Sequence, residues 1–139
     1  MVLLAEILAR VQPLLEREAD LRWAYLFGSC ARGADGRDVD IAVMPRGETY
    51  ASGVAWGSLI ADLEAAVAAK VDLIDLRVAS LPLAGTLLTE RVVLLDRERD
   101  ARHEWEANTT SRWLDFKPSY ERAALVRLEA MRARRKGAS

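Results

Sequence analysis

The chain has few of the residues that build disulfide frameworks, zinc clusters and membrane spans. It contains one cysteine, Cys30, and one histidine, His103, in 139 residues. A single cysteine excludes an internal disulfide and a cysteine zinc cluster, and it is typical of a protein from a reducing compartment. No apolar run approaches the roughly 18 residues that span a bilayer, and Glu6 and Arg10 interrupt the apolar N-terminus where a signal peptide would be continuous. These absences predict a cytoplasmic protein with no membrane partner.

The chain also lacks an excess of one charge and the commonest glycine-rich phosphate loops. Lysine plus arginine number 20 and aspartate plus glutamate number 21, so the overall charge does not predict direct binding to nucleic acid. No G-K-[ST] completes a P-loop, and no G-x-G-x-x-G fingerprint occurs. A chain of 139 residues forms about one domain. Any phosphate chemistry must therefore use another motif within that domain.

What the sequence does contain is an alternation of helical and strand patterns over its first 97 residues. A 3.6-residue apolar period predicts helices over residues 2–18, 50–69 and 81–90. Short apolar runs that end at turn residues predict strands over Leu21–Phe27, Val39–Met44, Val71–Leu76 and Arg91–Leu95. Pro13 is expected to kink or divide the first helix. We therefore expect an α/β (α+β) domain over residues 1–97, with a sheet covered by helices.

The rest of the chain, residues 98–139, shows no strand signal and is expected to form a helical tail that is broken near Pro118. His103 is expected to lie on the surface of this tail. Four aromatic residues are expected to pack the tail onto the domain, although exposed aromatics also anchor partner interfaces; they are Trp105, Trp113, Phe116 and Tyr120. The arginine-rich end of the tail is expected to be solvated.

The stretch LFGSCARGADGRDVDIAVM, residues 26–44, carries two aspartates in a predicted strand. Asp38 and Asp40 are two residues apart, so their side chains point to the same face of the strand. Aspartate is disfavoured in strands, and two like charges on one face repel unless a cation lies between them. Mg²⁺ prefers such oxygen ligands, with water and substrate phosphates completing its shell. The pair predicts a magnesium site, and a two-ion arrangement suits displacement at phosphorus.

The turn before this strand is suited to phosphate. Gly28 allows the backbone to approach an anion closely, and the Ser29 hydroxyl and the N–H groups that follow can donate to it. A helical turn over Cys30–Gly33 would add its dipole, and Arg32 is a further candidate contact. Cys30 itself is expected to be a small buried residue, because no histidine accompanies it locally.

The predicted strand VDLIDL offers a third carboxylate. Asp72 and Asp75 are separated by an odd number of residues, so they lie on opposite faces and only one can join Asp38 and Asp40. Strand alternation alone does not choose between them.

Together, these motifs resemble the polymerase-beta-like nucleotidyltransferase superfamily. The similarity rests on Gly28-Ser29, then Ala31-Arg32-Gly33, then Asp38-Val39-Asp40 before an apolar run. The small size is similar to the minimal nucleotidyltransferase (MNT) antitoxins encoded beside HEPN toxins. The resemblance implies a small mixed sheet covered by helices, and it favours Asp72 as third carboxylate, with Asp75 as the fallback. Eight residues separate Ser29 from Asp38, fewer than the roughly ten of many family members.

The resemblance also implies a reaction. ATP would bind with Mg²⁺ held by Asp38, Asp40 and Asp72, and a hydroxyl of the acceptor would attack the α-phosphorus. For an MNT antitoxin the implied acceptor is a tyrosine of its HEPN toxin, a ribonuclease that the added AMP silences. Two alternatives remain from the sequence: an antitoxin that only binds its toxin, and a transferase that modifies a small molecule, as aminoglycoside nucleotidyltransferases do.

Overall fold

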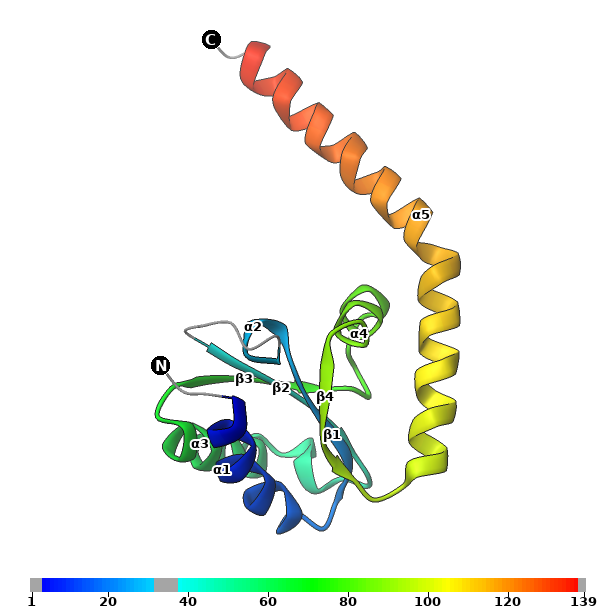
Figure 1. Cartoon of the computed structure of the whole chain (residues 1–139). Helices are drawn as coiled ribbons and strands as arrows, with labels where there is room; N and C mark the ends of the chain where they lie inside the picture. The colour runs from blue at the N-terminus through cyan, green and yellow to red at the C-terminus, as the bar shows by residue number, and fades with distance from the viewer. Residues whose placement is uncertain (1–3, 32–37, 138–139) are drawn as a thin grey trace.

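The computed structural model describes residues 4–31 and 38–137, which form a sheet with helices on both faces (Figure 1). The strands are β1 (Leu21–Phe27), β2 (Asp38–Pro45), β3 (Lys70–Asp75) and β4 (Arg91–Asp96). The helices are α1 (Leu4–Glu16), α2 (Gly28–Ala31), α3 (Gly53–Val67), α4 (Leu81–Leu87) and α5 (Arg99–Gly137), and the 3-10 turn η1 (Thr49–Ala51) precedes α3.

The four strands lie in the order β3-β2-β1-β4. β1 pairs antiparallel with both β2 and β4, whereas β2 and β3 run parallel. A parallel pair needs a crossover connection that leads the chain back to the starting edge, and η1 with α3 provides it. The sheet is therefore mixed, which confirms the predicted fold class.

Alternation along β2 divides the domain into two hydrophobic layers. Val39, Ile41 and Val43 belong to the core that α1 and α3 cover. Ala42 and Met44 point the other way and pack with apolar residues of α4 and of the first part of α5. Because Asp38 and Asp40 have the same parity as Ala42 and Met44, they lie on the face of α4 and α5.

The first part of α5 packs on the sheet through aromatic side chains. The Trp105 ring stacks on Tyr25 of β1, with ring centroids 6.3 Å apart. Trp113 is buried and lies against Gly85 of α4, where a Cβ atom would overlap its side chain. These two contacts confirm the expected packing of the tail. Phe116 and Tyr120 differ, because they are 44% and 39% exposed.

Neither internal proline ends its helix. α1 continues through Pro13, and α5 runs through Pro118 as one helix of 39 residues. The predicted break of the tail is therefore wrong. A proline removes one backbone hydrogen bond and crowds the preceding turn, which bends a helix without always ending it, and in Figure 1 the yellow and orange parts of α5 run in different directions. Long as it is, α5 is not apolar enough to cross a membrane, and neither is any other helix of the described ranges.

Candidate active site

Three of the predicted carboxylates meet on the face of the sheet that carries α4 and α5. Asp38 and Asp40 come from the start of β2, and Asp72 comes from β3. Asp40 and Asp72 are direct partners in the parallel register of these strands. Asp75 is paired with Val43 further along β3 and forms an ion pair with Arg77, with 3.2 Å between Oδ2 and Nη2. The register thus brings Asp72, and not Asp75, to the pair on β2.

The proximity of these carboxylates changes the acidity of Asp40. Burial raises the pKa of Asp40 first, and the neighbouring charges of Asp72 and Asp38 and a hydrogen bond with Asp72 raise it further. Like charges this close cannot all ionise without cost unless a cation or proton compensates them. The site is therefore electrostatically suited to a cation.

Gly28 brings the turn that was predicted to bind phosphate into contact with the carboxylates. It follows the last residue of β1, begins α2 and has a φ of +73°, a conformation that residues with a side chain rarely adopt. A Cβ atom at this position would overlap Oδ2 of Asp40. Gly28 is thus required by both its backbone angle and its contact with a candidate metal ligand.

The residues after Gly28 fix the turn to β2. The expected helical turn begins at Gly28 rather than at Cys30, and α2 carries Ser29 in its first turn. Cys30 is buried, as predicted, and its Sγ donates to the backbone oxygen of Asp38 at 3.5 Å. Arg32 and the residues from there to Arg37 lie outside the described residues.

The donor set fits Mg²⁺ better than a metal that needs a closed protein cage. Within the described residues, no three His, Cys, Asp or Glu side chains are arranged to enclose a metal ion. Mg²⁺ is usually bound by one or two carboxylates, while water and substrate phosphates supply its remaining ligands. Asp40 and Asp72 on adjacent strands, with Asp38 beside them, match that pattern.

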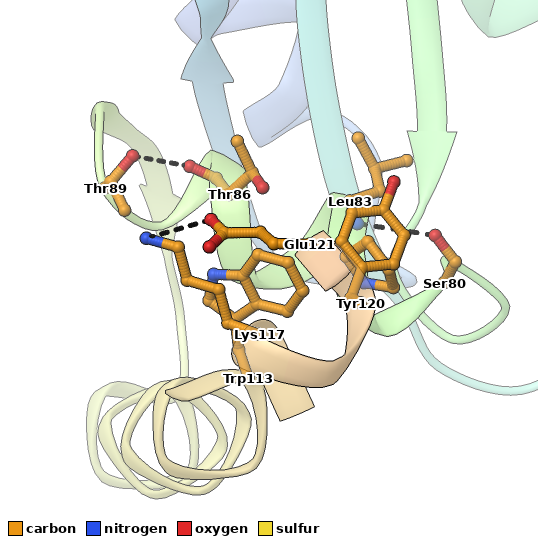
Figure 2. A pocket seen from close by; sticks show the side chains of 9 residues that line it. Ser80, Leu83, Thr86, Thr89, Trp113, Lys117, Tyr120 and Glu121 are labelled. Carbon is orange, nitrogen blue, oxygen red and sulfur yellow. Dashed lines mark hydrogen bonds and ion pairs between the residues drawn. The ribbon is translucent and has the colours of Figure 1, made fainter. Parts of the chain in front are cut away.

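A hollow runs from Gly28 towards α5. A cavity of about 230 Å³ lies between Phe27, Gly28 and α4. A second cavity, of about 630 Å³, lies between α4 and α5, and the residues of α5 that line it are Trp113, Lys117, Tyr120 and Glu121 (Figure 2). The two cavities share Leu83, Thr86 and Thr89 as lining residues. The sequence positions of these residues did not predict a cavity, because the residues come together only where α5 packs on α4.

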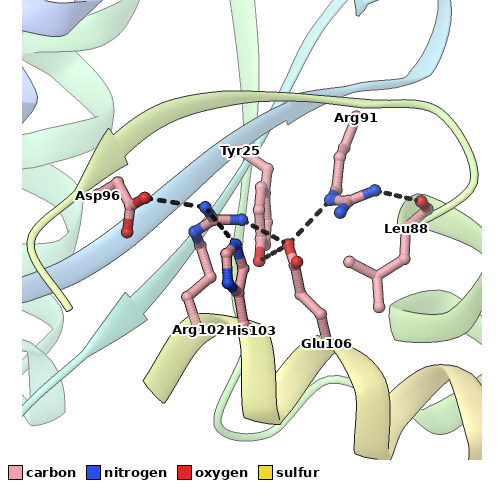
Figure 3. Close-up of polar contacts among 7 residues, drawn as sticks. All are labelled: Tyr25, Leu88, Arg91, Asp96, Arg102, His103 and Glu106. Carbon is pink, nitrogen blue, oxygen red and sulfur yellow. Dashed lines mark hydrogen bonds and ion pairs between the residues drawn. The ribbon is translucent and has the colours of Figure 1, made fainter. Parts of the chain in front are cut away.

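A buried polar cluster holds α5 on β1 and β4 and was also not evident from the sequence (Figure 3). Oε2 of Glu106 accepts hydrogen bonds from Tyr25 Oη at 2.7 Å, Arg91 Nε at 2.9 Å and Arg102 Nη1 at 3.0 Å. Arg102 also donates to Asp96 at 2.8 Å. His103 is exposed, as expected, and contacts Arg102. This cluster orients the helix and lies apart from the carboxylates of β2 and β3.

Comparison with known proteins identifies the family. The sequence model of the polymerase beta nucleotidyltransferase family matches residues 9–100. A search of curated proteins finds no match. Several solved structures are similar over most of the chain. One is a toxin–antitoxin MntA–HpeT mutant in which two aspartates two positions apart are replaced by glutamate: it is 28% identical, with a TM-score of 0.70, over 86% of this chain and 94% of that chain.

Two further similar solved structures include a nucleotide or a nucleotide modification. One is a toxin–antitoxin structure with AMP-PNP, 30% identical with a TM-score of 0.69 over 86% of this chain and 94% of that chain. The other is a tri-AMPylated HEPN toxin of Shewanella oneidensis in complex with its MNT antitoxin, 27% identical with a TM-score of 0.67 over 88% and 95%. The chain described here belongs to the polymerase beta nucleotidyltransferase family and is similar over most of its length to MNT antitoxins.

Proposed function

We propose that this protein is an antitoxin that transfers AMP from ATP to a tyrosine of a HEPN ribonuclease toxin and thereby neutralises it. The observation that carries the proposal is the alignment of Asp40 with Asp72 on parallel strands, in contact with the turn at Gly28. The HEPN toxin and AMP modification of a similar solved complex support the choice of acceptor and nucleotide.

Each site residue has a part in the proposed reaction. Asp38, Asp40 and Asp72 would hold Mg²⁺, two ions in this proposal, which when bound would supply positive charge to the reacting phosphates. Gly28 and the N–H and hydroxyl groups at Ser29 bind the β- and γ-phosphates, and Arg32 is proposed as a further contact. Asp72 is also proposed to accept the proton of the acceptor hydroxyl.

The proposed transfer is a single displacement at the α-phosphorus. The tyrosine oxygen forms a bond to this phosphorus while the bond from it to the bridging oxygen breaks. Pyrophosphate leaves with the electron pair of that bond, and AMP remains on the tyrosine. This chain's task is to hold the nucleotide in line with an oxygen that the toxin provides.

Labelled ATP tests the proposal directly. The protein is incubated with Mg²⁺, ATP labelled in its α-phosphate, and its candidate HEPN-domain partner, and modified tyrosines are identified by mass spectrometry. We expect label on the toxin, reduced to background by chelation of Mg²⁺ or by the double variant Asp38→Asn/Asp40→Asn. If an active, folded preparation transfers no label but still suppresses the toxin, the protein is a binding-only antitoxin.

A matched pair of substitutions tests the third carboxylate. Asp72→Asn is expected to abolish labelling, whereas Asp75→Asn should retain it, because Asp75 faces the opposite side of the sheet and pairs with Arg77. The reverse result would assign the role to Asp75. Transfer of label to an aminoglycoside, with none to the protein partner, would instead show a small-molecule transferase.

A further inference from the structure

The second half of α5 forms a long surface that the rest of the chain leaves uncovered. Every residue from 114 to 137 is exposed, and from here on the name tail is used for this segment alone. Figure 1 shows this orange-to-red segment projecting away from the domain on the side of α2 and α4. In proteins most of the stability of a helix comes from packing of its apolar face, and this segment has no residue buried in such packing within the described part of the chain. The tail therefore has the properties of a surface that becomes buried in a complex.

One side of the tail continues the side of α5 that packs on the domain. Starting from the buried Trp113, steps of seven, four, four and three residues lead along one helical face to Tyr120, Ala124, Leu128 and Met131. We call these last four residues the tail face. Leu128 is 44% exposed and Met131 is 54% exposed. Because this apolar face continues from the buried Trp113, a partner bound along it would also contact the domain.

The tail face starts at a cavity that borders the one at Gly28. Tyr120 lines this 630 Å³ cavity between α4 and α5. Both helices pack on the sheet face that carries Asp38, Asp40 and Asp72. A macromolecule bound along the tail face would thus lie on the same side of the sheet as the carboxylates.

Charge restricts the kind of occupant. The tail contains seven lysines and arginines and three acidic residues, whereas the remainder of the chain contains 13 basic and 18 acidic residues. Arg127, on the border of the tail face, adds a cation beside Leu128 and Met131. Two copies of so basic a helix repel when paired, and the acidic remainder repels nucleic acid. An apolar protein surface with an acidic rim is complementary to the tail in both respects.

We propose that the acceptor protein docks on the tail face through an apolar surface with an acidic rim, and that this docking delivers its hydroxyl to the carboxylates of β2 and β3. The inference rests on the proposed function for the identity of the acceptor. The similarity to the antitoxin of the solved HEPN complex covers 88% of this chain, so it includes more than half of α5. The tail is therefore, at least in part, a shared feature of these antitoxins.

A double substitution on the tail face tests the docking surface. Leu128→Asp/Met131→Asp places two charges on the face, and the matched control Val126→Asp/Ala133→Asp places the same charges on the opposite side of the same exposed helix. Binding of the candidate HEPN-domain partner is measured by calorimetry without ATP, with circular dichroism as the check on helicity. We expect the face variant to bind at least about tenfold more weakly, and the control to bind like the unmodified protein.

The outcomes separate this inference from the proposed function. Unchanged binding of the face variant, or equal loss in both variants, overturns the docking surface. So does a face variant that loses only self-association in sedimentation or only RNA binding, while toxin binding persists. If the unmodified protein transfers no label but the face variant alone loses toxin binding, the transferase proposal fails and the docking surface stands. ATP affinity, measured in parallel, is expected to be equal in all three proteins.

Discussion

At the scale of single residues, the geometry of the candidate active site depends on a missing side chain, at Gly28, as much as on the carboxylates that are present. Asp40 and Asp72 provide the charge, but Asp40 occupies its position because Gly28 presents no Cβ. The positive φ of Gly28 aims the chain from β1 into α2 within one residue. One glycine thus sets the distance between the phosphate turn and the carboxylates.

Gly28→Ala should therefore cost more stability and activity than the strain of its positive φ alone would, because the new Cβ also overlaps Asp40. Gly47 is a matched control, because it also has a positive φ, of 63°, and a Cβ there would meet no atom within 4 Å. Both substitutions carry a conformational cost of about 1 kcal/mol. We expect Gly28→Ala to lose more stability in urea unfolding and to reduce AMP transfer severely, whereas Gly47→Ala keeps full transfer. If Gly28→Ala and Gly47→Ala changed stability and AMP transfer equally, the Asp40 side chain would be able to move away from the new Cβ without loss of stability or activity.

At the scale of secondary-structure elements, a few buried polar contacts determine where α5 lies. Glu106 and Arg102 on α5 connect to Tyr25 on β1, Arg91 on β4 and Asp96 at its end. Most of α5 is polar and gains little from burial, so this cluster and the two tryptophans supply its attachment. The direction of the tail, and with it the proposed docking surface, follows from these contacts.

Glu106→Gln should loosen this attachment and change how stability depends on pH. Burial raises the pKa of Glu106, but hydrogen bonds from Arg91 and Tyr25 outweigh burial and lower the pKa below its ordinary value of 4.5. A carboxyl with a lowered folded-state pKa stabilises the fold above its ordinary pKa, and this contribution is lost as the pH falls through the folded-state value. Removing the charge also leaves part of the buried Arg102 charge uncompensated, at a cost of about 3 kcal/mol.

Urea unfolding between neutral pH and about pH 3 checks both parts of this expectation. The unmodified protein should lose stability below about pH 4.5, whereas the Glu106→Gln variant should be less stable at neutral pH and show a flatter acid limb. Glu104→Gln is the control, because Glu104 lies on the same helix two residues before Glu106 and is exposed. Parallel pH curves for all three proteins would contradict the assigned role of Glu106.

At the scale of the whole molecule, charge is separated although the sum is nearly zero. The basic tail and the acidic remainder nearly cancel in the net charge of −1. The whole-chain value therefore conceals a surface that attracts acidic partners at one end and repels them at the other. An acceptor with an acidic rim would be oriented by this separation before it makes close contact.

Salt should weaken the complex as a result. Exposed charges are screened within about 8 Å at physiological ionic strength and more strongly at high salt. We expect toxin affinity to fall by about tenfold or more between about 0.05 M and 0.5 M NaCl, and the Arg127→Glu variant to bind more weakly and to show a smaller salt dependence. The salt dependence of ATP binding cannot replace this measurement, because salt also screens the charges of the ATP phosphates. An affinity that is constant across this range would contradict an electrostatic contribution of the tail.

The sequence by itself determined the elements and the candidate chemistry, because both depend on short-range patterns. Strand alternation placed Asp38 and Asp40 on one face, and the apolar run at Leu21–Phe27 predicted β1 to the residue. Pro118 was misjudged, because a local rule for prolines does not include the packing that holds α5 on either side. Strand alternation left Asp72 and Asp75 open and the family resemblance favoured Asp72; the tertiary structure showed that Asp72 lies beside Asp40, because their proximity depends on the register of β3 against β2. It alone also showed the overlap that makes Gly28 necessary, the polar cluster at Glu106 and the uncovered tail face, because each arises from contacts between residues far apart in the chain.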